Sequence, residues 1–105
     1  MTDRELLEMA AKAAGMDGCA AEFGDPNRLV FLPDGMFIEW DPLTDDGDAL
    51  RLAVKLSLCI THYGDEVVAG NEKGTILEDV NRVGNLYAAT RRAIVRAAAE
   101  IGKNL

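Results

Sequence analysis

The sequence predicts a single α+β domain in which three helices pack with an antiparallel sheet built from two or more hairpins. Three segments place apolar residues at helical spacing and start with side chains that cap helices. Two other stretches place apolar runs on both sides of turn residues, as hairpins do. The 105 residues suit one domain, and no linker-like tract divides them. The expected order over residues 1–105 is helix, hairpin, helix, hairpin, optional edge strand and helix.

The first helix is expected at the N-terminus, because Thr2 followed by Glu5 matches the capping-box pattern. Apolar residues follow at spacings of three and four, and Gly15 supplies a stop signal. Residues 16–27 are rich in glycine, aspartate and alanine, which indicates a loop with a short strand near Phe23. The pattern therefore predicts a helix with one buried face, followed by an irregular connection.

The first hairpin is expected to join residues 29–32 to residues 36–40 across Pro33-Asp34-Gly35. Proline followed by Asp-Gly between two apolar runs is a turn signal, since glycine accepts positive φ without steric cost. Trp40 ends the second strand, and Pro42 prevents further ladder pairing because it has no backbone N–H.

The second helix is expected after Thr44, which is the predicted N-cap. Aspartates crowd into its first turn, where negative charge is favourable near the positive end of the helix dipole. Its apolar residues span an arc of roughly 200° on a helical wheel, so this helix is predicted to lie centrally against the sheet. The strip left exposed would carry Asp48, Arg51 and Lys55.

A second hairpin is expected over residues 58–63 and 66–69, joined across Gly64-Asp65. Residues 75–80 are predicted to add an edge strand. The last helix is expected over residues 86–101, with Asn85 as N-cap and Gly102 as the C′ residue. Its buried face is predicted to include Leu86, Tyr87, Ala93, Ile94, Ala97, Ala98 and Ile101, with Arg91 at the edge of that face and Arg92, Arg96, Glu100 and Lys103 opposite.

The net charge of −7 is unevenly distributed along the chain. Residues 1–81 hold 17 acidic and 6 basic residues, whereas residues 82–105 hold 5 basic and 1 acidic residue. The favoured interpretation is that the two parts neutralise each other in the fold; the alternative is a face kept for a partner. The acidic total argues against nucleic-acid binding. The absence of a long apolar run predicts a soluble intracellular protein.

The sequence contains no pattern that specifies a cofactor, a metal or a catalytic centre. The acidic cluster after Trp40 lacks the spacing of a calcium loop, and the glycines form no phosphate-binding motif. Cys19 and Cys59 are predicted to be free thiols, with Cys59 a small buried side chain. His62, the only histidine, has no accompanying nucleophile motif and is expected at the surface of a strand end.

Three segments carry a family resemblance. They read D-R-E-L-L-E-M-A-A-K-A-A-G at 3–15, W-D-P-L-T-D-D-G-D-A-L-R-L-A-V-K-L at 40–56 and Y-A-A-T-R-R-A-I-V-R-A-A-A-E-I-G at 87–102. Together they resemble small phage and prophage proteins of uncharacterised function, in which Asn commonly follows the tryptophan where this chain has Asp41. The resemblance implies a phage or prophage origin and the cytoplasm of a bacterial host, and it brings no catalytic residues.

The leading functional hypothesis is a non-enzymatic, phage-related accessory protein that binds another protein or itself. One alternative is an acidic mimic of nucleic acid that inhibits a host DNA-binding enzyme. Another is a small enzyme that uses His62 with nearby carboxylates. The candidate interaction surface comprises Asp45, Asp46, Asp48, Arg91, Arg92 and Arg96.

Overall fold

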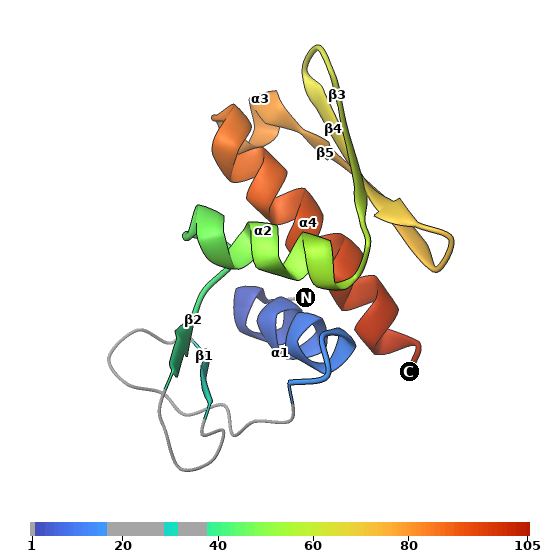
Figure 1. Ribbon diagram of the computed structural model, residues 1–105. Helices are drawn as coiled ribbons and strands as arrows, with labels where there is room; N and C mark the ends of the chain where they lie inside the picture. The colour runs from blue at the N-terminus through green and yellow to red at the C-terminus, as the bar shows by residue number, and fades with distance from the viewer. Residues whose placement is uncertain (1, 17–28, 32–37) are drawn as a thin grey trace.

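The computed structural model describes residues 2–16, 29–31 and 38–105, and it has the predicted α+β architecture (Figure 1). Its helices are α1 (Asp3–Ala13), α2 (Asp46–Lys55), α3 (Val80–Val83) and α4 (Leu86–Lys103). Its strands are β1 (Leu29–Phe31), β2 (Ile38–Trp40), β3 (Cys59–Tyr63), β4 (Glu66–Asn71) and β5 (Gly74–Asp79). The strands form two antiparallel sheets, β1-β2 and β3-β4-β5.

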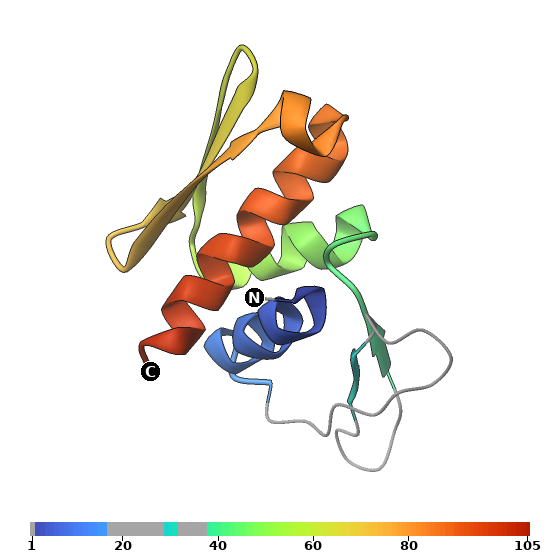
Figure 2. The same ribbon diagram turned by 180° about the vertical axis from the view of Figure 1, so that it is seen from behind.

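Helix α4 is the central element of the fold, because α1, α2, β4 and β5 all pack against it. Figures 1 and 2 show the three-stranded sheet along one side of α4, with α1 and α2 along the other. Small side chains make this arrangement possible, since alanine lets a neighbouring backbone approach closely. The α4 residues that form the middle of the core are Ala89, Ala93, Ile94, Val95, Ala97, Ala98 and Ala99.

The prediction that the helix after Trp40 would lie centrally against the sheet is wrong. Helix α2 buries only Ala49, Leu52 and Ala53, and it packs against α4. Leu50 and Val54 belong to the predicted apolar arc but are 61% and 70% exposed. The contact with α4 thus covers only part of the apolar arc of α2, and the rest of the arc faces solvent.

The predicted helix starts follow from local hydrogen bonds. Thr2 and Glu5 form the complete capping box of α1, and the Asn85 side chain accepts from the N–H of Ala88 at the start of α4. The N-cap of α2 is Asp45 rather than Thr44, because the Asp45 carboxylate accepts from the N–H of Asp48 at 2.8 Å. Two of the three predicted caps are therefore confirmed and the third is displaced by one residue.

The segment before α2 is held by a compact set of hydrogen bonds. The Asp48 carboxylate accepts from the backbone N–H of Asp41 at 3.0 Å, and the Asp41 carboxylate accepts from the N–H of Leu43 at 3.2 Å. The N–H groups of Thr44 and Asp45 donate in turn to the carbonyl of Asp41. The crowded aspartates after Trp40 thus close the turn that leads into α2, and Asp41 is buried there.

We expect Asp45→Ala to lower the free energy of unfolding by about 1 kcal/mol, the usual effect of losing an N-cap oxygen. Thr44→Ala should change it by less than about 0.5 kcal/mol, because Thr44 is exposed and does not cap the helix. Urea unfolding of the two variants measures this difference. Equal destabilisation by both substitutions would contradict the assignment of the cap to Asp45.

The hairpin predictions are confirmed where the structure describes them. β1 pairs with β2 in the register Leu29↔Trp40, while the turn expected at 33–35 and the strand expected near Phe23 lie outside the described residues. β3 pairs with β4 across a turn in which Gly64 has φ +54, and β5 forms the predicted edge strand. The short helix α3, which follows β5 directly, was not predicted.

The structure corrects the predicted roles of Gly102 and Cys59. Gly102 does not stop the last helix, which continues to Lys103, with Asn104 as its C-cap. Gly102 instead lies where α4 touches α1, and a Cβ built there would stand 1.9 Å from the carbonyl oxygen of Met9. Cys59 is a free thiol, as predicted, but it is exposed at the start of an edge strand rather than buried; Cys19 lies outside the described residues.

Candidate functional site

A groove of about 510 Å³ lies between α2, β3 and the first half of α4. Three lining residues come from α2, two from β3 and five from α4; in that order they are Asp46, Ala49, Leu50, Ile60, His62, Leu86, Tyr87, Thr90, Arg91 and Ile94. Most of these side chains are apolar. The name apolar groove is used below for the surface lined by Leu50, Ile60, His62, Leu86, Tyr87 and Ile94.

Large apolar side chains remain exposed around the apolar groove. Tyr87 is 72% exposed, Leu50 is 61% exposed and Leu86 is 43% exposed. Leu86 and Tyr87 were predicted to be buried, and this prediction is wrong because α1 packs near the other end of α4, where Gly102 meets Met9. Apolar side chains gathered in this way on a water-exposed surface are typical of a site that contacts another molecule.

Arg91 sets the position of α2 relative to α4 at the rim of the groove. Its Nε donates to the carbonyl of Leu43 at 2.9 Å, and its Nη1 pairs with the Asp46 carboxylate at 2.6 Å. The Arg91 side chain is largely buried, whereas that of Asp46 is largely exposed. The apolar groove therefore has one acidic and one basic group at its rim, and they neutralise each other.

His62 lies in the groove but is bound in a way that does not activate a nucleophile. Its Nε2 is 3.0 Å from the hydroxyl oxygen of Thr90, and that hydroxyl is 2.8 Å from the carbonyl of Leu86. The Thr90 hydroxyl has one proton and donates it to the carbonyl of Leu86, so its oxygen accepts from Nε2–H in the tautomer that carries the proton on Nε2. A base that activated Thr90 would have to accept the proton of that hydroxyl, so this contact does not make Thr90 a nucleophile. The geometry gives the enzyme hypothesis no support.

The predicted acidic part of the interaction surface is largely paired within the protein. Asp45 and Asp48 face Arg51, at 3.9 and 2.7 Å respectively, and Asp46 faces Arg91. A mimic of nucleic acid needs a row of accessible negative charges, since phosphate charge dominates the recognition of DNA. These internal partners reduce the charge that the cluster presents to another protein.

Arg92 and Arg96 do not lie at the apolar groove. They line a second pocket together with Leu6, Glu78, Arg82 and Val83, called the arginine pocket below. Thr90 and Ile94 face the groove, and residues two positions further on point about 200° away around a helix with about 100° per residue. The two sites thus flank α4 on opposite sides.

The interpretation that the two parts of the chain neutralise each other is confirmed by ion pairs across the fold. Arg91 pairs with Asp46, Arg92 pairs with Asp3 at 3.1 Å, and Arg96 pairs with Glu78 at 2.5 Å. In each pair a base of α4 meets an acid from the first 81 residues.

The six predicted interaction residues form no single surface, and the apolar lining of the groove was missed. Its one signal in the sequence was the apolar arc of α2.

The part of the chain that the structure describes contains no cluster of three or more potential metal ligands. Within that part, no helix has both the length and the hydropathy needed to cross a membrane. Comparison of the chain with protein-family models, with curated proteins and with solved structures found no significant match.

Proposed function

We propose that the protein is a non-enzymatic, phage-related interaction module, acting in the bacterial cytoplasm, that forms a homodimer through the apolar groove. The observation that carries this proposal is the gathering of Leu50, Leu86 and Tyr87, all exposed, around one hollow. Tyrosine is enriched among the residues that contribute most to binding energy at interface centres, and leucine adds apolar area that is removed from water. The resemblance of three segments to phage and prophage proteins supports the proposed origin.

A second copy of the chain is the partner that the surface fits best. In a twofold dimer the same patch contacts itself, so one patch must offer both a hollow and the side chains that fill it. The apolar groove has both, because Tyr87 and Leu50 protrude beside the hollow that they line.

The charges at the groove also favour self-association. The whole chain has a net charge of −7, which makes contact between two acidic surfaces unfavourable. At the groove, however, the only charged lining residues among those described are Asp46 and Arg91, which form an ion pair. Two copies can therefore meet at the groove without placing like charges against each other. A strongly basic or acidic partner would find no net charge there to attract it.

Light scattering and sedimentation equilibrium over a range of protein concentrations test the proposal. We expect the wild-type chain to dimerise and Tyr87→Lys to weaken the dimer by about 30-fold, corresponding to about 2 kcal/mol for a buried aromatic anchor. Leu77→Lys is the matched control, since Leu77 is 53% exposed on β5 and lies outside the groove. It should leave the dimer intact.

Two results would contradict dimerisation through this groove. One is a wild-type chain that stays monomeric at millimolar concentration. The other is an equal effect of Tyr87→Lys and Leu77→Lys, which would mean that added charge rather than the groove controls association. Circular dichroism of both variants checks that the substitutions leave the fold unchanged, as expected from the exposure of Tyr87 and Leu77.

A further inference from the structure

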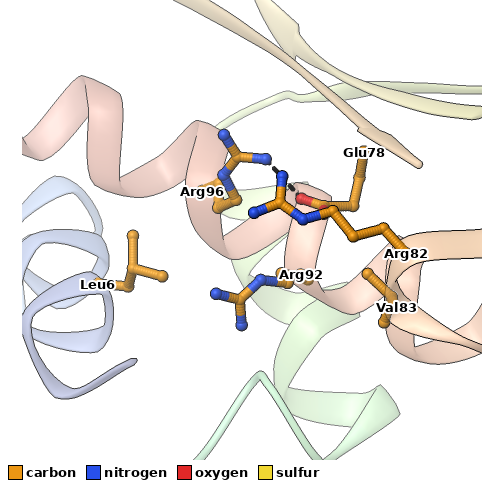
Figure 3. A pocket seen from close by; sticks show the side chains of 6 residues that line it. All are labelled: Leu6, Glu78, Arg82, Val83, Arg92 and Arg96. Atoms are coloured by element: carbon orange, nitrogen blue, oxygen red, sulfur yellow. Dashed lines mark hydrogen bonds and ion pairs between the residues drawn. The ribbon is translucent and has the colours of Figure 1, made fainter. Parts of the chain in front are cut away.

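The arginine pocket has a volume of about 540 Å³ and brings three guanidinium groups to one place (Figure 3). Arg92 and Arg96 reach it from neighbouring turns of α4, and Arg82 reaches it from α3. Figure 3 shows the three guanidinium groups gathered in the space between Leu6 of α1 and Glu78 of β5. Two helices, α3 and α4, thus place positively charged side chains in the same pocket.

The carboxylates around the arginine pocket do not balance its positive charge. Glu78 pairs with Arg96 and Asp3 pairs with Arg92, whereas Arg82 forms no ion pair with any residue that the structure describes. Three cations therefore face two anions. Like charges brought together repel each other, and a bound anion would remove this repulsion. The surplus of positive charge is notable in a chain whose net charge is −7.

The polar surface that the pocket presents to a ligand is mainly guanidinium. The Glu78 side chain is 4% exposed, whereas about a third of the Arg92 and Arg96 side chains is exposed and Arg82 is exposed as a residue. Glu78 is thus buried, and its ion pair with Arg96 fixes the position of that guanidinium group. An incoming anion meets N–H donors rather than a carboxylate.

We propose that the arginine pocket binds a phosphate monoester. Guanidinium groups bind phosphate oxygens with two parallel hydrogen bonds, and the dianionic group suits a site with several of them. The hollow is of the size that holds a small organic ligand, larger than a phosphate group needs. Leu6 and Val83 provide an apolar wall against which the organic part of the ester can pack.

This site is independent of the proposed dimer, because the two sites lie on opposite sides of α4 and share no lining residue. Titration calorimetry at constant ionic strength tests it, with inorganic phosphate, phenyl phosphate and benzoate as probes. Phenyl phosphate should bind at least about fivefold more tightly than inorganic phosphate, because its ring buries apolar surface. Benzoate should bind more weakly than phenyl phosphate. Equal or tighter binding of benzoate would overturn the assignment to phosphate.

Arg82→Gln is the most direct variant, because Arg82 has no ion pair with a described residue to lose and the fold should be retained. It should weaken phenyl phosphate about tenfold, which is the lower end for a hydrogen bond to a charged group. Arg51→Gln is the matched control: Arg51 is a similarly exposed arginine on α2, outside the pocket, and its loss should leave binding unchanged. Absence of heat with every probe, or equal weakening by both variants, would overturn the proposal.

Discussion

Gly102→Ala is expected to lower the free energy of unfolding by about 3 kcal/mol or more. A Cβ at this position would stand 1.9 Å from the carbonyl oxygen of Met9 and 2.8 Å from its carbonyl carbon. Both atoms belong to the backbone of α1, so no side-chain rotation relieves the clash, and the two helices must move apart. Overpacking of this kind costs more than the roughly 1 kcal/mol that alanine gains over glycine within a helix.

Gly74→Ala is the matched control for this prediction. A Cβ at Gly74 would meet its nearest neighbour, the Cγ of Glu100, at 3.5 Å, which is an ordinary contact. Urea unfolding should therefore show a loss of less than about 1 kcal/mol for Gly74→Ala. A Gly102→Ala variant as stable as the wild type would mean that α1 and α4 are not in close contact at this point.

Arg96→Leu is expected to lower the free energy of unfolding by about 2–3 kcal/mol. Its partner Glu78 is 3% exposed, and removing the guanidinium leaves a carboxylate buried without its ion pair. Breaking a buried pair from one side costs about 3–5 kcal/mol, and the lower value applies here because Arg96 is partly exposed and Arg82 lines the same pocket.

The double variant Glu78→Leu with Arg96→Leu should recover at least half of this loss. Replacing both partners of a buried ion pair by apolar side chains is often neutral, because neither charge then has to be desolvated. Urea unfolding of the two single variants and the double variant gives the coupling energy between the residues. Losses that simply add would show that the ion pair contributes nothing to stability.

Local features of the sequence predicted the helices and strands of the fold with the exception of α3. The capping box at Thr2 and Glu5, the N-cap at Asn85 and the glycine at position 64 each act within a few residues, so their effect can be read without knowing the neighbours in space. The cap of α2 was displaced by one residue because Thr44 and Asp45 are both good capping residues. The N–H groups of both residues donate to the carbonyl of Asp41, and in the resulting turn Asp45 takes the N-cap position.

The opposed charges of the two parts of the chain also had a predictable consequence. Net charge along a sequence is additive, and a compact fold brings unlike charges together, so pairing of α4 with the acidic part was expected. The choice of partners was not. Arg91 turns toward α2, whereas Arg92 turns toward α1 and Arg96 toward β5, and these three directions follow from the position of α4 between other elements.

The sequence by itself determined which segments form helices and strands, because capping and turn formation depend on neighbouring residues. Only the tertiary structure decided which apolar faces are covered, since burial depends on the area that a distant element offers. Thus α4 rather than α2 became central, and Gly102 became a contact with α1 rather than a helix stop. For the same reason Leu50 and Tyr87 were left exposed, and three arginines from α3 and α4 came to share one pocket.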